Sequence, residues 1–471
     1  MLKKQVGIIG MAIMGFNLSL NIEKHGYNVS IFNRSREKTD KIIFENPKKK
    51  LFPYYTIQEF VFSLQNPRFI ILMVQAGKVT DYFLDLLEPF LEEKDIIMDG
   101  GNSFYKDTIR REKKLLKKNI NYIGAGISGG EEGALNGPAI MPGGKKYIYE
   151  FISPILKKIA AKTSKGEACV TYIGPNGSGH YVKMIHNAIE YANMQLISEI
   201  YFLFKKIFNF NNNYIANIFT KWNQGELNSY LLKITCNILV KKDEKNDFLL
   251  DKILDIADNK GTGKWAIHEA LDLNEPLTIA TESIFSRYIS VLKEERIQAS
   301  KIFFGTKKTI KKYPKNIKVY IEKMRKALYL SIIISYTQGF SQLRNASNTK
   351  KWNLNCKKIA KIFRKGCIIQ AKILKEIINS YENNIKTTNF FLEPYFKNIS
   401  NTYQQSLRDV IIYAIQHGIP IPALSSAINY YDNYRTKFLP SNLIQAQRDY
   451  FGSHYYQRID KSGNFHTKWA E

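Results

Sequence analysis

Hydrophobic positions in the first third of the chain form short apolar runs, separated by amphipathic helical patterns. The runs lie at 6–9, 27–32, 68–74, 95–98 and 121–125, and loops rich in Gly, Asn or Ser follow several of them. Continuous apolar runs of this length are typical of strands buried on both faces, as in a parallel sheet covered by helices. The pattern therefore predicts an α/β domain with a doubly wound sheet.

Beyond this region the periodicity becomes helical. A Gly-rich break at 174–179 precedes amphipathic helical patterns that continue to about residue 436, without a series of strand patterns. We expect a Rossmann-like α/β domain at 1–176, a large all-helical domain at 177–435 and a C-terminal tail at 436–471. Within the tail, Pro and Gly punctuation makes 447–454 too irregular for a core helix.

The first turn carries a dinucleotide-binding signature. Gly10, Ala12 and Gly15 form a G-x-A-x-x-G motif between a strand and a helix, which lets the backbone approach a pyrophosphate at the helix N-terminus. The second strand ends in Asn-Arg-Ser, where an NAD-binding protein usually has an acidic residue. The guanidinium of Arg34 and the hydroxyl of Ser35 suit a 2′-phosphate, so the sequence predicts NADP rather than NAD.

A polar stripe begins directly after the Gly-rich break. Lys183, His186, Asn187, Glu190 and Tyr191 share one face of a predicted helix, with apolar residues on the opposite face. The stripe lacks the i, i+4 ion pairs typical of exposed helices. Lys183 and Glu190 would lie roughly 10 Å apart along the axis, enough for a sugar acid between them.

Composition narrows the possible partners. The 471 residues include 69 Lys and Arg against 42 Asp and Glu, a formal net charge of +27. This balance suggests anionic partners, but the basic residues are scattered and no nucleic-acid-binding motif or apolar run of about 18 residues occurs. We expect no nucleic-acid partner, no membrane partner and no metal site. The four Cys show no paired spacing, which suggests free thiols and a cytoplasmic protein.

Several motifs together resemble the 6-phosphogluconate dehydrogenase family over essentially the whole chain. Besides the first turn and the polar stripe, they are Asp-Gly-Gly-Asn-Ser at 99–103, Ser-Gly-Gly-Glu-Glu-Gly at 128–133, Lys-Gly-Thr-Gly-Lys-Trp at 260–265, Thr-Glu-Ser at 281–283 with Arg287, and 443–452. The resemblance implies oxidative decarboxylation of 6-phospho-D-gluconate to D-ribulose 5-phosphate and CO2, with reduction of NADP+, in the pentose phosphate pathway. It also implies that Lys183 is the general base and acid, and that Glu190 is the general acid.

The resemblance assigns binding roles as well. The residues it implies for the cofactor are Gly10, Met11, Ala12, Ile13, Met14, Gly15, Asn33, Arg34, Ser35, Val74, Gln75, Ala76 and Asn102. Those it implies for the substrate are Asn102, Ser128, Gly129, Gly130, His186, Asn187, Tyr191, Lys260, Thr262, Arg287, Arg448 and His454. It further implies a homodimer in which Arg448 and His454 reach the other subunit's site.

Some positions depart from the family pattern, and other functions remain open. Gln75 stands where Lys is common, and Ala188, Ala192 and Asn193 replace Gly, Gly and Asp on the catalytic helix. The nearest alternative is another NADP-dependent β-hydroxyacid dehydrogenase, such as one acting on 3-hydroxyisobutyrate, although such enzymes are shorter and need no phosphate-binding set. A nucleic-acid-binding protein is the alternative from another class.

Overall fold

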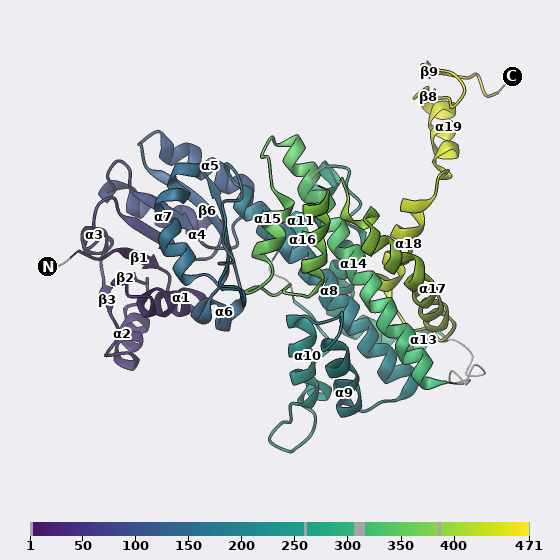
Figure 1. Ribbon diagram of the computed structural model, residues 1–471, viewed down its shortest axis with the longest axis horizontal. Helices are drawn as coiled ribbons and strands as arrows, with labels where there is room; N and C mark the ends of the chain where they lie inside the picture. Colours follow the sequence, from purple (N-terminus) through teal and green to yellow (C-terminus); the bar gives the residue numbers. More distant parts are fainter. Residues whose placement is uncertain (1–2, 259–260, 306–315, 385–387, 471) are drawn as a thin grey trace.

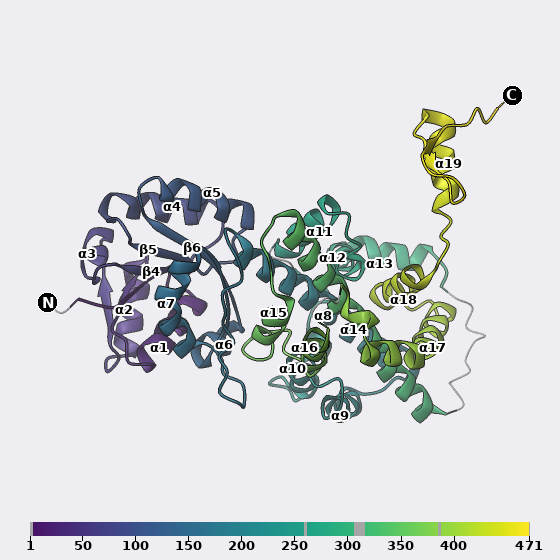
Figure 2. The ribbon, with the colours of Figure 1, turned by 45° about the horizontal axis from the view of Figure 1, so that its top comes forward.

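The computed structural model describes residues 3–258, 261–305, 316–384 and 388–470. An α/β lobe contains the N-terminus, a helical lobe lies beside it, and a C-terminal segment projects from the helical lobe (Figure 1). The projection remains in the turned view (Figure 2). The Rossmann-type fold with a large helical part is therefore confirmed.

The α/β lobe is built on one seven-stranded sheet of order β3-β2-β1-β4-β5-β6-β7, parallel except for the antiparallel pair β6–β7. Its strands are β1 (Val6–Ile9), β2 (Val29–Phe32), β3 (Leu51–Tyr54), β4 (Phe69–Leu72), β5 (Ile96–Asp99), β6 (Asn121–Ser128) and β7 (Ala139–Gly144). Five correspond to the apolar runs. The pattern missed β3, an edge strand that contains Pro53, and β7, which contains Pro142 and two glycines.

Alternating side chains along the strands supply two separate cores. On β4, Phe69 and Ile71 join the core with α1 and α7, whereas Ile70 and Leu72 join the one with α3, α4 and α5. Burial on both faces explains why the strands are mostly apolar. The helices of this lobe are α1 (Ile13–Lys24), α2 (Arg36–Glu45), α3 (Ile57–Phe62), α4 (Lys78–Leu87), the 3₁₀ turn η1 (Glu88–Phe90), α5 (Tyr105–Leu116), α6 (Gly130–Asn136) and α7 (Lys146–Ile159).

The helical lobe is organised around α8 (Ser178–Phe208), a helix of 31 residues that packs on β6 and β7 at its start and on α11, α12, α14 and α18 farther along. The other elements of the lobe are α9 (Asn212–Asn223), α10 (Tyr230–Val240), η2 (Leu249–Lys252), α11 (Thr262–Asp272), α12 (Thr278–Val291), α13 (Lys293–Ile302), α14 (Ile317–Thr349), α15 (Cys356–Ile362), α16 (Ile373–Asn383), η3 (Phe390–Leu392), α17 (Pro394–Gln416) and α18 (Pro422–Arg435).

A carboxylate on α8 fixes the position of α18. Glu199 is 3% exposed and accepts hydrogen bonds from the backbone N–H groups of Ala423 (2.8 Å) and Leu424 (2.9 Å). These amides belong to the first turn of α18, where backbone donors lack helical partners. The helix that begins beside β6 and β7 thus also holds the last helix before the tail.

The tail contains α19 (Ser441–Gly452) and the short antiparallel pair β8 (Tyr456–Gln457) and β9 (Asn464–Phe465). The expectation of an irregular segment at 447–454 was wrong for most of its length. Pro440 and Gly452 stand at the two ends of α19 instead of interrupting it, and Ser453 closes it with a left-handed backbone (φ 49°). α19 is nevertheless no core helix, since most of its side chains are exposed.

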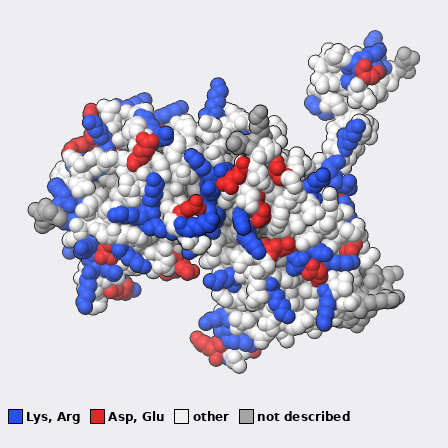
Figure 3. Space-filling model, in the orientation of Figure 1, with Lys and Arg blue, Asp and Glu red and all other residues white. Residues whose placement is uncertain are grey.

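Two further observations concern the surface. On the face of the molecule shown in Figure 3, Lys and Arg are interspersed with Asp and Glu over both lobes and do not form one basic patch. Within the four described ranges, no helix is both long enough and apolar enough to cross a membrane.

Candidate active site

Glycines on both sides bring α8 close to β6. A Cβ at Gly126 would lie 2.3 Å from Lys183 Cβ, and one at Gly179 would lie 2.4 Å from the Gly124 carbonyl oxygen. Such distances leave no space for a methyl group. Close packing therefore places Lys183 against the carboxyl-terminal part of β6, where open α/β sheets bind their ligands.

A chain of hydrogen bonds joins three elements beside Lys183. Ser128 Oγ at the end of β6 lies 3.1 Å from His186 Nε2, and His186 Nδ1 lies 3.1 Å from Asn187 Oδ1. Asn187 Nδ2 donates to Thr262 Oγ1 at the start of α11 (3.1 Å). The amide oxygen only accepts, so Nδ1 carries the imidazole proton and Nε2 accepts from the serine hydroxyl. Burial and the positive charge of Lys183 hold the pKa of His186 well below its usual value and leave the imidazole neutral, although the hydrogen bond with Asn187 opposes this shift.

Lys183 and Glu190 have pKa values shifted toward each other. Burial lowers the pKa of Lys183, which is 7% exposed, although the negative charge of Glu190 opposes the shift. Burial raises the pKa of Glu190, and the positive charges of Lys183 and Arg287 oppose that shift. Desolvation penalises each charged form, so the site favours a neutral amine and a protonated carboxyl more than water does. These are the forms that a general base and a general acid require.

An anion-binding environment lies farther along the same face of α8. The Arg287 guanidinium stacks on the Tyr191 ring, with 3.7 Å from Cζ to the centroid, and Arg287 Nη1 donates to the Asp258 carbonyl (3.0 Å). The N-terminus of α11 adjoins this ring, because a Cβ at Gly263 would lie 3.0 Å from it. A helix N-terminus beside an arginine favours a phosphate group. Lys260 lies outside the described residues.

The cofactor turn has the expected geometry. Gly10 has φ 98°, and a Cβ at Gly15 would lie 1.9 Å from the Gly10 carbonyl oxygen, so α1 starts tightly against the turn. Asn33 Oδ1 accepts from the Met11 N–H (3.2 Å), and Asn33 Nδ2 donates to the Ser35 carbonyl (3.2 Å). Both polar groups of Asn33 therefore tie the turn to the end of β2. No side chain caps α1, so its first N–H groups remain available to phosphates.

The remaining candidates for the cofactor surround this turn. Arg34 is exposed, and the described part of the chain gives it no ion pair. Asn102 is exposed in the loop after β5, where Asp99 accepts from the Gly101 N–H (3.0 Å) and Ser103 Oγ (2.6 Å). Ile13 and Met14 at the start of α1 are partly or fully exposed, as are Val74, Gln75 and Ala76 in the loop between β4 and α4, whereas Met11 is buried. The residues present fit a phosphorylated dinucleotide.

Comparisons with known proteins all point to one family over nearly the whole length of the chain. Residues 5–174 match the model of the NAD binding domain of 6-phosphogluconate dehydrogenase, and residues 179–469 match the model of its C-terminal domain. The chain belongs to the 6-phosphogluconate dehydrogenase family. It is 59% identical to the decarboxylating 6-phosphogluconate dehydrogenase of Salmonella typhimurium and 57% identical to that of Buchnera aphidicola from Acyrthosiphon pisum, with 100% of each chain covered.

A solved structure is also similar. The 6-phosphogluconate dehydrogenase of Plasmodium falciparum, described in its apo form, with its cofactor NADP+ and with its substrate 6-phosphogluconate, is 43% identical. The match has a TM-score of 0.95 and covers 99% of this chain and 100% of the other. The fold is therefore that of a 6-phosphogluconate dehydrogenase in both lobes.

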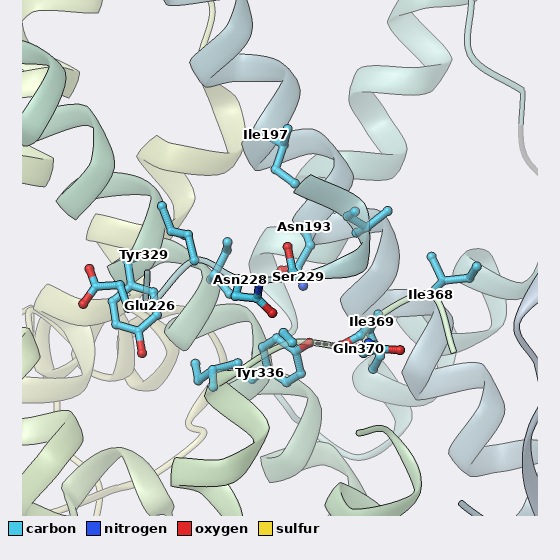
Figure 4. Close-up of a pocket in the computed structure, with 15 residues that line it drawn as sticks. Asn193, Ile197, Glu226, Asn228, Ser229, Tyr329, Tyr336, Ile368, Ile369 and Gln370 are labelled. Atoms are coloured by element: carbon cyan, nitrogen blue, oxygen red, sulfur yellow. Dashed lines mark hydrogen bonds between the residues drawn. The ribbon is translucent and has the colours of Figure 1, made fainter. Parts of the chain in front are cut away.

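Positions that depart from the 6-phosphogluconate dehydrogenase pattern on α8 lie in the protein interior. Ala188 and Ala192 are each 1% exposed and belong to the helical core. Asn193 Oδ1 accepts from Ser335 Oγ on α14 (2.7 Å). Asn193 also lines a pocket formed by α8, α14 and the segments before α10 and α16, which no candidate site residue lines (Figure 4). These three changes alter packing behind the stripe, not its polar groups.

The tail residues lie apart from the rest of the candidate site. Arg448 is exposed on α19, where its guanidinium donates to Gln445 Oε1 (3.1 Å). His454 follows the end of α19 and is also exposed. The structure does not bring either side chain to the site of its own chain, because the tail projects away from both lobes (Figure 1).

Sequence reasoning missed some residues that shape the site. Gly126 sets the closeness of β6 and α8, and the Asp258 carbonyl holds Arg287. Cys367 is buried near Lys183, where its Sγ donates to the Phe363 carbonyl (3.1 Å). No spacing signal connects Cys367 with Lys183, because they are far apart in the chain. The described residues include no group of three or more His, Cys, Asp or Glu side chains arranged to hold a metal ion.

Proposed function

We propose that this protein oxidises and decarboxylates 6-phospho-D-gluconate to D-ribulose 5-phosphate and CO2, with NADP+ as the oxidant. The observation that carries the proposal is the buried stripe of α8. It joins a desolvated lysine and glutamate to an arginine and a helix N-terminus suited to a phosphate. Similarity to decarboxylating 6-phosphogluconate dehydrogenases over the full length, at 59% identity to that of Salmonella typhimurium, supports the same reaction.

Binding residues divide between the two ligands. For the cofactor we propose the turn 10–15, Asn33, Arg34 and Ser35, residues 74–76 and Asn102, with Arg34 on the 2′-phosphate. For the sugar acid we propose Asn102, residues 128–130, His186 and Asn187. For its phosphate we propose Tyr191, Thr262 and Arg287, which lie toward α11, together with Arg448 and His454 of the tail and with Lys260.

Lys183 acts first as a base and then as an acid. Its neutral amine accepts the proton of the 3-hydroxyl. The bound NADP+ supplies a hydride acceptor for C3. Protonated Lys183 then donates a hydrogen bond to the new C3 carbonyl oxygen. It stabilises the negative charge that develops there as the bond from C2 to the carboxylate breaks and CO2 leaves.

Glu190 completes the reaction. Loss of CO2, with a proton passed from Lys183 to the C3 oxygen, leaves an enediol with five carbons. To give the ketose, its C1 must gain a proton while the hydroxyl group on its C2 returns its proton to Lys183. The raised pKa of Glu190 keeps the carboxyl protonated to a higher pH than in water, so it can donate the proton to C1. Neutral His186, fixed between Ser128 and Asn187, orients the sugar hydroxyl groups without adding charge.

The test is an assay that follows NADPH absorbance and CO2 release together, with the wild type and Lys183→Ala. We expect both signals with 6-phosphogluconate, and a loss of about 10²–10⁴-fold in both for the variant. Unchanged turnover in Lys183→Ala would refute the assigned base. Reduction of NADP+ with 3-hydroxyisobutyrate but not with 6-phosphogluconate would favour the alternative substrate.

The active form that we propose is a homodimer in the cytoplasm. A tail that projects from its own lobes is suited to reach a second copy, and it exposes large apolar side chains such as Phe438 (71%), Leu443 (62%) and Phe451 (72%). In that dimer Arg448 and His454 complete the partner's phosphate site. Four free thiols suit a reducing compartment.

A further inference from the structure

One buried carboxylate organises the whole tail. Asp449 on α19 is 0% exposed, although the helix around it is largely open to solvent. Its Oδ1 accepts from the Tyr455 N–H (3.0 Å) and His466 Nδ1 (2.9 Å). Its Oδ2 accepts from the Thr467 N–H (3.0 Å) and Trp469 Nε1 (2.8 Å). The end of α19, the turn after it and the last residues of the described chain therefore meet at one side chain.

Only a carboxylate satisfies this arrangement. Two of the four partners are backbone amides, one is an indole N–H, and His466 presents a ring nitrogen that donates in this geometry. An amide in place of Asp449 would keep one acceptor oxygen and turn an NH2 group toward two donors. Burial raises the pKa of Asp449, but hydrogen bonds from His466, Thr467 and Trp469 outweigh burial and hold the pKa at about 2.

The same network reaches the neighbouring arginine. Tyr455, whose N–H is held by Asp449, has a left-handed backbone (φ 55°), and its carbonyl accepts from Gln445 Nε2 (2.5 Å). Gln445 Oε1 in turn accepts from Arg448 Nη1 (3.1 Å). Asp449 therefore fixes the turn, the turn fixes Gln445, and Gln445 orients the guanidinium.

We infer that Asp449 is a positioning residue that pre-organises the tail so that Arg448 is presented in a fixed orientation to the sugar phosphate in the partner subunit. The inference rests on the proposed role of Arg448. Its physical basis is entropic, because among the described residues the main contacts of α19 lie within the tail, which projects from the helical lobe (Figure 1). An arginine on an unfolded tail would lose conformational freedom on binding, and that loss would weaken its hold on the phosphate.

The experiment compares Asp449→Asn with Asp460→Asn, which makes the same change of charge in the same tail. Asp460 is exposed, and its carboxylate accepts hydrogen bonds from the neighbouring Arg458 guanidinium (2.8 and 2.7 Å). For Asp449→Asn we expect KM for 6-phosphogluconate to rise about tenfold or more, with KM for NADP+ unchanged. Asp460→Asn should match the wild type, and Asp449→Glu, which keeps the carboxylate, should lie between the wild type and Asp449→Asn.

A double-mutant cycle distinguishes positioning from a general loss of structure. If Asp449 acts through Arg448, the fold increase in KM of the double variant Arg448→Ala/Asp449→Asn should be well below the product of the fold increases of the two single variants. Effects that multiply fully, or equal KM values for Asp449→Asn and the wild type, would overturn the inference. An unchanged KM in Arg448→Ala would instead refute the proposed role of Arg448 itself.

Discussion

Two side chains of the candidate site are tuned in opposite directions by the same surroundings. Lys183 and Glu190 are seven residues apart on α8 and share a desolvated space, which penalises the ammonium and the carboxylate alike. Their mutual attraction works against both shifts. The pair therefore functions with one proton in total. With two protons Lys183 is charged and cannot act as a base, and with no proton Glu190 cannot act as an acid.

The pH dependence should report this shared proton. We expect a bell-shaped profile of kcat/KM, with its acid limb above 4.5 and its alkaline limb below 10.5, the ordinary pKa values of the two groups. In Glu190→Gln the residual activity should lose the alkaline limb. The remaining limb should shift to lower pH than the pKa of Lys183 in the wild type, because Glu190 raises that pKa. Retention of the alkaline limb would contradict this assignment.

Arg34 should set the choice of cofactor. Its guanidinium is exposed at the end of β2, whereas both polar groups of Asn33 are engaged in the turn. Arg34→Ala should raise KM for NADP+ by about 10–100-fold, as expected for the loss of a charge-assisted contact to phosphate. KM for NAD+ should change little, since NAD+ has no 2′-phosphate. Steady-state kinetics with both cofactors measures this, and equal effects on the two would contradict it.

At the scale of elements, the sequence predicted the strands and motifs themselves better than the tertiary contacts around them. The apolar runs identified β1, β2, β4, β5 and β6 because burial on both faces keeps these strands mostly apolar, with few polar positions such as Ser30. The spacing identified the polar stripe of α8, and the lack of i, i+4 ion pairs argued against an exposed face. The elements that cover the stripe, α11 and β6, could not be predicted, since they pack there only in the tertiary fold. Lys183 and Cys367 come together only through the tertiary fold, so no local pattern could connect them.

The contact between β6 and α8 is sensitive to a single methyl group. Gly126→Ala would place Cβ 2.3 Å from Lys183 Cβ, so strand and helix must separate. We expect a loss of about 1–3 kcal/mol in the free energy of unfolding and a fall in kcat larger than any change in KM for NADP+. Denaturant unfolding and steady-state kinetics measure these effects.

Gly225→Ala is the matched control for that change. A Cβ there would make only one ordinary contact, 3.5 Å from the Trp222 carbonyl oxygen. It should leave stability and activity near those of the wild type. Equal behaviour of the two variants would show that close packing at Gly126 does not position Lys183.

For the whole molecule, the net charge of +27 contributes little to the site. Basic and acidic side chains are interspersed over both lobes in Figure 3, and the anion-binding groups were identified by position, not by number. What the whole molecule adds is the tail, whose Arg448 and His454 lie apart from the site of their own chain. The sequence could not show this separation, because it gives no orientation of the tail relative to the lobes.

Mixed dimers test whether the tail completes the partner's site. Lys183→Ala and Arg448→Ala should each be nearly inactive at low substrate. After they are unfolded together and refolded, a mixed dimer holds one site with Lys183 from one subunit and Arg448 from the other. Random pairing should therefore restore about a quarter of wild-type activity. No recovery, with mixed dimers verified by mass spectrometry, would place Arg448 in its own subunit's site.

The length of α8 gives one last consequence. This helix carries Lys183 and Glu190 near its start and, at Glu199, the carboxylate that holds the first turn of α18. Each residue of an α-helix turns the direction of the following side chains by about 100°. One residue inserted between Glu190 and Glu199 would leave the reacting pair in register but turn the α18 anchor away. A single helix therefore sets the positions of the reacting pair and of the helix from which the tail leaves. The residues between Glu190 and Glu199 can be substituted far more readily than their number can change.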